Sequence, residues 1–277
     1  MEFLSYLISG ISLGSVYAII ALGYTMVYGI AKMLNFAHGD IIMVGGYISF
    51  CAMNYLGLPS IVGIILAILV CTVLGVVIEG LAYKPLRQAT SLAVLITAIG
   101  VSYFLQNAAQ LLWSSSPKVF TPVVSPSAKL TLFDGQLSIS WLTIVTVLVC
   151  VAIMLALTAF TGRTKMGKAM RACSEDRGAA QLMGINVNAT ISMTFAIGSA
   201  LAAIAGVLLC SYSPVLQPTT GSMPGALLGG LLLGVIEAMA QAYISTQLSN
   251  TILFAVLIVV LLVKPSGLLG KYVPEKV

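Results

Sequence analysis

Eight runs of apolar residues joined by short polar gaps set the tightest limit on what this 277-residue chain can fold into. A helix that crosses a bilayer needs about 20 apolar residues, whereas a strand of a membrane barrel has about 10 residues of alternating polarity. The runs are continuous and longer than such strands, which favours helices. We expect them at 3–30, 41–56, 60–83, 92–113, 141–161, 191–213, 225–244 and 250–263.

The composition excludes several classes of protein. Only 8% of the residues are charged and 59% are hydrophobic, whereas an average soluble domain has roughly 25% charged residues. This excludes a soluble globular enzyme, a nucleic-acid-binding protein and a disordered protein. The runs leave no room for a separate soluble domain. The sequence therefore predicts an all-α, polytopic integral membrane helix bundle of about eight apolar segments, with residues 1–277 as one transmembrane domain.

Lysine and arginine in the short loops predict the orientation of the chain. The loop 162–190 is the most basic and should be cytoplasmic, so the longer polar loop 114–140 and the N-terminus should lie outside. The C-terminal tail is also basic, yet three apolar runs separate it from the loop 162–190. Either one run is re-entrant, or the tail lies outside, or one crossing is missing.

Two local patterns in the loops predict structure of their own. Alternating apolar residues flank Asp134-Gly135, which predicts a β-hairpin over 129–140 that serves either as a cover or as a docking surface for an external partner. In the cytoplasmic loop, Ser174 is a good N-cap, and Gly184 can take the left-handed position that ends a helix. We expect a helix of about nine residues here, which is too short to be stable alone. It either packs against its own bundle or docks a cytoplasmic partner.

Small residues recur at spacing four within the apolar runs, which lets membrane helices approach one another closely. Gly198, Ala202 and Gly206 form one such row, and Gly10 and Gly14 form another. The pattern predicts a tightly packed bundle and no particular function.

Few side chains in the sequence could carry chemistry. There is no phosphate-binding loop of the G-x-x-x-x-G-K-[ST] type, the five cysteines include no C-x-x-C pair, and the single histidine, His38, cannot form a multi-histidine metal site. We expect no catalytic set, metal or cofactor. Glu237 falls inside an apolar run, whereas the NFAHGD segment, with Asn35, His38 and Asp40, lies in the gap 31–40, which we expect on the inner side as the entrance to the second helix. Each is either a structural hydrogen-bonding group or part of a solute or proton path.

Three strings of the sequence resemble one known family. LGSVYAIIALGYTMVYGIAKMLNFAHGD (13–40), MGKAMRACSEDRGAAQLMGINV (166–187) and KPSGLLGK (264–271) are similar to branched-chain amino-acid ABC transporter permeases of the LivH type. The resemblance implies a multi-pass permease subunit in the bacterial inner membrane that translocates branched-chain amino acids. It also implies a second homologous permease subunit, two cytoplasmic ATPase subunits that hydrolyse ATP, and a periplasmic amino-acid-binding protein.

The resemblance gives the short cytoplasmic helix a role. ABC importer permeases carry an EAA-x-x-x-G pattern where they couple to the ATPase; here Gly178-Ala179-Ala180 and Gly184 keep the spacing, with glycine in place of glutamate. The expected coupling residues are Arg171, Glu175, Asp176, Ala179, Ala180 and Gly184. The candidates for the translocation path are Asn35, His38, Asp40 and Glu237.

The segment 214–230 departs from the family pattern. Only one S-x-P-G string is present where the resemblance implies two, and the same region causes the odd number of crossings. We therefore expect a variant shortened at this point. Three alternatives stay open: a urea or short-amide ABC permease, a proton-coupled secondary carrier that uses Glu237 or His38, and a transport-inactive membrane subunit.

Overall fold

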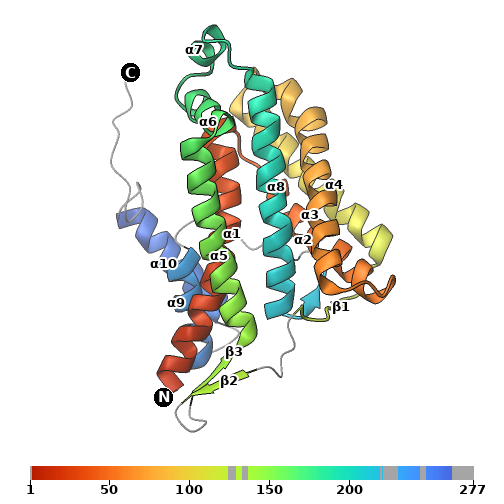
Figure 1. Cartoon of the computed structure of the whole chain (residues 1–277), viewed down its shortest axis with the longest axis vertical. Coiled ribbons are helices and arrows are strands. Elements are labelled where there is room, and N and C mark those ends of the chain that lie inside the picture. The colour runs from red at the N-terminus through yellow and green to blue at the C-terminus, as the bar shows by residue number, and fades with distance from the viewer. Residues whose placement is uncertain are drawn as a thin grey trace.

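The computed structural model describes residues 2–123, 129–132, 137–218, 220, 230–243 and 248–263. Within these ranges the chain is a helix bundle, with short strands at one end (Figure 1). The helices are α1 (Glu2–Ala31), α2 (Ala37–Asn54), α3 (Ser60–Ile78), α4 (Ser91–Trp113), α5 (Trp141–Arg163), α6 (Lys165–Glu175), α7 (Arg177–Leu182), α8 (Val187–Tyr212), α9 (Gly230–Tyr243) and α10 (Ser249–Val263). A π-helical turn at Glu79–Tyr83 and a 3₁₀ turn at Lys84–Leu86 extend α3.

The all-α membrane bundle is confirmed, but the expectation of about eight spanning segments is not. Among the described residues, five helices are long and apolar enough to cross a membrane: Tyr6–Ala31, Ser60–Leu86, Ser91–Trp113, Trp141–Arg163 and Val187–Tyr212. Helices α9 and α10 have 14 and 15 residues. At 1.5 Å per residue they reach only about 21–22 Å, against a hydrocarbon core of about 30 Å.

Helix α8 is the centre of the bundle, because it packs against α1, α2 and α3 at positions where a side chain is small or absent. A Cβ atom on Gly198 would lie 2.7 Å from Val27, and one on Gly45 of α2 would lie 2.8 Å from the Cα of Ala203. A Cβ atom on Gly206 would collide with the Ile42 carbonyl group. The row of small residues predicted from the sequence is therefore a packing face.

Helix α9 packs on the N-terminal half of α1 and runs antiparallel to it. A Cβ on Gly10 would lie 3.2 Å from Ala238 Cβ, and the rings of Tyr6 and Tyr243 are 5.6 Å apart. Helix α8 also runs opposite to α1, because it begins next to α7 at the end of the bundle where α1 finishes (Figure 1). Helices α8 and α9 therefore run in the same direction. This is the structural form of the crossing problem, in which an odd number of apolar runs separates the loop 162–190 from the basic tail.

The predicted hairpin is confirmed in its strands. Strand β2 (Lys129–Leu132) pairs antiparallel with β3 (Leu137–Ser140), and Leu132 faces Leu137; the Asp134-Gly135 turn lies outside the described residues. A second pair joins β1 (Lys118–Val119) to β4 (Val215–Leu216), and so ties the loop after α4 to the segment after α8. Both pairs lie at the end of the bundle opposite α6 and α7 (Figure 1).

Candidate functional site

The loop that we expect to be cytoplasmic contains two helices, α6 and α7, and the expected start of the short helix is wrong. Ser174 and Glu175 belong to the last turn of α6. The N-cap of α7 is Asp176, whose Oδ1 accepts hydrogen bonds from the N–H groups of Gly178 at 2.7 Å and Ala179 at 3.0 Å. A carboxylate that is two residues closer to the helix satisfies the free N–H groups directly, so the helix has six residues, not about nine.

The predicted end of α7 is confirmed. Gly184 has a φ of +81°, in the left-handed region. The N–H of Ile185 bonds the Ala180 carbonyl at 3.0 Å, and the N–H of Gly184 bonds the Gln181 carbonyl at 3.0 Å. This pair of bonds is the Schellman motif, which satisfies the last carbonyl groups of a helix. The two caps hold a six-residue helix that could not persist by itself.

The expected coupling residues divide into one anchor and an exposed set. Ala180 is buried with Met170 and Cys173 of α6 and Ile30 of α1. The other five are exposed: Arg171, Glu175, Asp176, Ala179 and Gly184.

Sequence reasoning missed the two most exposed large apolar side chains in this loop. Leu182 and Met183, at the end of α7, are 89% and 82% exposed. In the sequence both residues lie directly before Gly184, which ends the helix, and this position is the signal that could have identified them. Apolar side chains displayed outside the bundle in this way are typical of a surface that binds another protein.

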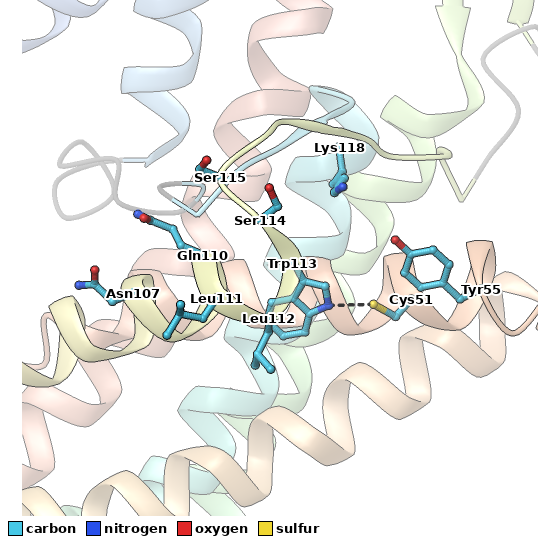
Figure 2. A pocket seen from close by; sticks show the side chains of 10 residues that line it. All are labelled: Cys51, Tyr55, Asn107, Gln110, Leu111, Leu112, Trp113, Ser114, Ser115 and Lys118. Carbon is cyan, nitrogen blue, oxygen red and sulfur yellow. Dashed lines mark hydrogen bonds between the residues drawn. The ribbon is translucent and has the colours of Figure 1, made fainter.

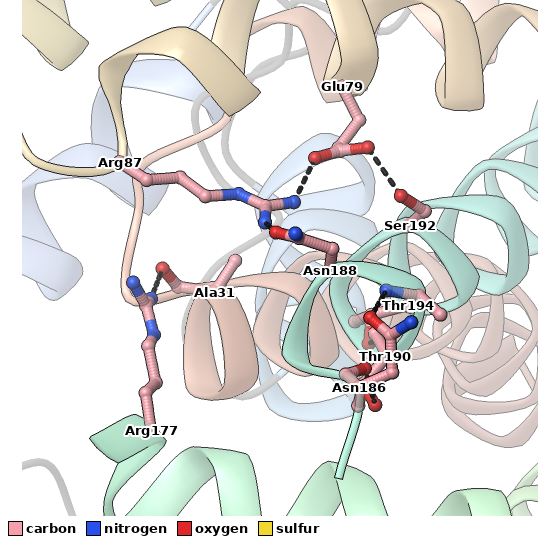
Figure 3. A network of polar contacts seen from close by, with 10 residues as sticks. Ala31, Glu79, Arg87, Arg177, Asn186, Asn188, Thr190, Ser192 and Thr194 are labelled. Carbon is pink, nitrogen blue, oxygen red and sulfur yellow. Dashed lines mark hydrogen bonds and ion pairs between the residues drawn. The ribbon is translucent and has the colours of Figure 1, made fainter. Parts of the chain in front are cut away.

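Polar contacts tie α7 and the turn after α3 to the ends of neighbouring helices (Figure 3). Arg177 of α7 donates to the carbonyl of Ala31, the last residue of α1. Arg87 forms an ion pair with Glu79 and donates to Asn188 Oδ1 at the start of α8. Glu79 also accepts a 2.6 Å hydrogen bond from Ser192, so the Arg87–Glu79 pair connects the turn after α3 to α8. Arg177 separately connects α7 to α1.

Arg87 and Arg177 line a cleft of about 530 Å³ beside these contacts, between the turn after α3 and the α7–α8 connection. Burial, and next the nearby positive charge of Arg87, hold the pKa of Arg177 below its usual range. Arginine keeps its charge even so, because its ordinary pKa is above 12. The cleft is therefore a basic surface next to the coupling helix.

Three of the four expected path residues lie together: Asn35 is in the connection between α1 and α2, and His38 and Asp40 are in the first turn of α2. Asn35, His38 and Asp40 are each no more than 3% exposed. The Tyr83 hydroxyl donates to Asn35 Oδ1 at 3.0 Å, and Gln106 Nε2 donates to Asp40 Oδ1 at 2.9 Å.

The first turn of α2 lies inside the bundle, beside α1. The His38 ring packs edge-on against Tyr24, and a Cβ on Gly23 would lie 3.0 Å from it. Gly23 precedes the end of α1 by eight residues, which is about 12 Å of helix. Helix α2 therefore begins inside the bundle, whereas the sequence suggested a helix entrance in an inner loop.

The fourth path residue, Glu237, lies at a different place. It is buried on α9, where its Oε2 accepts a 2.7 Å hydrogen bond from the Tyr17 hydroxyl, and Gln241 donates to its Oε1 at 3.2 Å. Tyr17 precedes Tyr24, the neighbour of His38, by seven residues, or about two turns of α1. The structure therefore does not bring Glu237 into the group formed by Asn35, His38 and Asp40.

A pocket of about 900 Å³ opens at the strand end of the bundle, between the ends of α2 and α4. Figure 2 shows its lining, in which Trp113 donates to Cys51 Sγ at 3.1 Å. The other lining side chains mix polar and apolar types: Tyr55, Asn107, Gln110, Leu111, Leu112, Ser114, Ser115 and Lys118. Sequence reasoning named none of them, because each is an unremarkable residue near the end of an apolar run.

No cluster among the described residues could hold a metal ion. The site therefore consists of a short helix with exposed apolar side chains at one end of the bundle, a buried polar group in its interior and a mixed pocket at the other end. Such an arrangement suits the movement of a solute through a membrane.

Comparison with known proteins agrees with this arrangement. A family described as "Branched-chain amino acid transport system / permease component" matches residues 6–221. The chain is 43% identical over 233 residues to the high-affinity branched-chain amino acid transport system permease protein BraD of Pseudomonas aeruginosa, covering 79% of this chain and 75% of BraD. It is 42% identical over 241 residues to LivH of Escherichia coli strain K12, covering 80% of this chain and 75% of LivH.

A more distant relative is the probable branched-chain amino acid transport permease protein LivH of Methanocaldococcus jannaschii, which is 28% identical over 210 residues. This alignment covers 74% of the chain and 65% of that relative. No solved structure matches the chain. Since the family match extends over most of the chain and the bacterial relatives share more than two fifths of the aligned residues, this protein belongs to the branched-chain amino acid transport system permease family.

Proposed function

We propose that this chain is the membrane subunit through which branched-chain amino acids cross the bacterial inner membrane in an ABC importer. The family match over residues 6–221 carries the proposal. The importer would contain a second homologous permease subunit, two cytoplasmic ATPase subunits and a periplasmic amino-acid-binding protein. The chain itself is a transport component and not an enzyme.

Helix α7 is the proposed coupling element. Its caps, Asp176 and Gly184, fix its length, and Ala180 anchors it on α6 and α1. Movement of an ATPase subunit against Leu182 and Met183 would pass through Arg177 to the end of α1. Arg171, Glu175 and Ala179 are exposed on the same loop and would complete the contact surface.

The proposed path uses the buried polar group in the interior. Asn35, His38 and Asp40 lie where α2 begins inside the bundle, and interrupted helices at this depth are typical of solute sites in transporters. Glu237, held by Tyr17 and Gln241, would support the α1–α9 contact from a separate position.

The crossing problem has a proposed solution in re-entry at α9. Helices α8 and α9 run in the same direction, and α9 begins beside Gly14, about halfway along α1. If α9 enters and leaves on the outer side, α10 can carry the basic tail to the cytoplasm and keep the positive-inside rule. Reporter fusions test this: a cytoplasmic tail with Gly221 outside supports re-entry, and a periplasmic tail contradicts it and supports a lost crossing.

Reconstitution tests the proposed function. The chain would be co-expressed with its genomic neighbours, and the purified complex assayed for leucine uptake and for ATP hydrolysis with leucine-loaded binding protein. Stimulated hydrolysis with uptake supports the proposal. ATPase association without stimulation would indicate a transport-inactive subunit. Uptake by this chain alone, driven by a proton gradient, would indicate a secondary carrier.

The coupling role has its own matched pair of variants. Asp176→Ala removes the side-chain cap of α7, which typically contributes about 1 kcal/mol, and should lower leucine-stimulated ATP hydrolysis about fivefold. Ser174→Ala changes a hydroxyl that bonds only the Arg171 carbonyl within α6, and should leave stimulation unchanged. Equal effects of the two substitutions would contradict the assigned cap.

A further inference from the structure

Helix α4 differs from the other peripheral helices in what it exposes. The large exposed side chains of α5 are apolar, as at Leu148 and Leu155. On α4 the exposed positions combine the polar Asn107 and Gln110 with large apolar side chains, as at Ile96, Phe104 and Leu111. Polar side chains inside a membrane face protein or a water-filled space, because lipid cannot hydrogen-bond to them. The last turns of α4 therefore differ from α5 in carrying two polar side chains, Asn107 and Gln110, among their exposed apolar ones.

Both polar side chains belong to the pocket at the strand end of the bundle, which we call the outer pocket. Asn107 and Gln110 line the pocket of about 900 Å³ at the outer end of α4. Gln106 is the next residue inward, and its Nε2 donates both to Ser102 Oγ at 3.2 Å and to Asp40 Oδ1 at 2.9 Å. Polar groups thus continue from the pocket to the acid at the start of α2.

One oxygen of the Asp40 carboxylate, beyond the one that Gln106 bonds, can accept a further hydrogen bond. Asp40 is 2% exposed, and its Oδ2 has no hydrogen-bond partner in the part of the chain that the structure describes. Its neighbour Gln106 lies seven residues, or about 10 Å, from the outer end of α4, so the carboxylate is deep in the hydrocarbon region. A carboxyl oxygen left unpaired there is costly unless a ligand satisfies it.

We propose that the outer pocket, Asn107, Gln106 and Asp40 form the outer half of the translocation path, where Asp40 Oδ2 receives the ammonium group of the transported amino acid. This proposal rests on the proposed function. It adds that α4 lines the translocation path and that Asp40 contacts the ammonium end of a zwitterionic solute. Leu111, Leu112 and Trp113 at the pocket supply apolar surface for an aliphatic side chain.

Spin labelling of the assembled complex tests the wall. Asn107→Cys and Leu148→Cys would each be labelled with a nitroxide, in a chain whose five native cysteines are replaced and which retains leucine uptake. The positions match in depth, because Asn107 lies six residues from the outer end of α4 and Leu148 lies seven from that of α5. We expect the label at 107 to collide mainly with a water-soluble nickel chelate, and the label at 148 mainly with oxygen dissolved in lipid.

Two results would overturn the assignment of α4. Oxygen accessibility at 107 equal to that at 148 means that α4 faces lipid. Low accessibility to both reagents means a dry contact with a neighbouring subunit. Both accessibility results can be interpreted whether or not the labelled variant takes up leucine. If the wild-type complex fails to take up leucine, the proposed function fails, while the nickel result at 107 still decides whether α4 lines a water-filled path.

Asp40→Asn tests the ammonium contact, because asparagine keeps an acceptor for Gln106 and removes the charge. We expect leucine uptake to fall about tenfold or more, since hydrogen bonds to charged groups are the strong ones. Asp40→Glu, which restores the charge, should recover part of the uptake. Wild-type uptake by Asp40→Asn would overturn the contact. If that variant does not assemble, nickel accessibility of a label at Gln106→Cys decides instead, and an inaccessible label there overturns the path to Asp40.

Discussion

Helices α5 and α8 are both long and strongly apolar, yet their surroundings are opposite. The most apolar stretch of α5 has a mean hydropathy of 2.7 and is 6% buried, whereas that of α8 has a mean hydropathy of 2.1 and is 72% buried. Lipid is as apolar as a leucine side chain, so apolarity does not draw a helix into a bundle. The small residues of α8 and the polar bonds at its inner end do so.

The largest effect should come from filling the closest helix contact. Gly206→Leu would force α8 away from the Ile42 carbonyl region of α2, and overpacking of this size costs more than about 3 kcal/mol. We expect no folded protein in detergent, as judged by size-exclusion chromatography. Gly162→Leu on α5, where a Cβ atom meets nothing within 4 Å, is the control and should yield normal protein.

A smaller loss of folding stability should follow when the Glu79–Arg87 ion pair beside α8 is broken. Glu79→Ala leaves Arg87 without its carboxylate and Ser192 without its acceptor, and removal of one partner of a buried pair costs about 3 kcal/mol or more. The midpoint of thermal unfolding should fall accordingly. Arg163→Ala at the exposed end of α5 should change it little, since surface charges contribute less than about 1 kcal/mol.

Leucine truncation compares the two helices most directly. Leu201 of α8 is 6% exposed and Leu155 of α5 is 62% exposed. Leu201→Ala should create a cavity and lower stability by about 2 kcal/mol or more, whereas lipid can fill the space left by Leu155→Ala. Chemical denaturation in mixed micelles measures both. A larger loss at Leu155 would mean that another subunit, and not lipid, covers α5.

The smallest difference should be found at the N-caps. Asn186 Oδ1 accepts from the Ala189 N–H at 3.0 Å and caps α8, while Ser140 Oγ accepts from the Leu142 N–H at 3.3 Å and caps α5. Asn186→Ala should cost about 1 kcal/mol and Ser140→Ala a few tenths. Hydrogen exchange of the first-turn amides would resolve the difference, and equal protection losses would show that the bond lengths do not matter.

The sequence was sufficient for features that depend on local patterns. The helical class, the β2–β3 hairpin and the role of Gly184 all follow from periodicity or turn chemistry within about ten residues. The start of α7 was misplaced because Ser174 and Asp176 are both good caps, and only the packing of α6 decides between them.

Features that depend on tertiary packing could not be read from the sequence. In the sequence Glu79 lies five residues before Lys84, but in the structure it is buried and pairs with Arg87. The depth of Asp40 depends on where α2 begins relative to α1, which no local pattern encodes. The exposure of Asn107 and Gln110 likewise depends on how α4 packs against α2.

The start of α2 inside the bundle also bears on how the chain is made. Although α2 has 18 residues, most of them buried, it is not among the five segments apolar enough to cross a membrane, and it carries both His38 and Asp40. Segments of this kind partition poorly from the translocon into lipid by themselves. Helix α2 should therefore enter the bilayer together with α1 and α3, so the order of synthesis, with α1 first and α3 only a few residues behind, becomes part of the folding mechanism.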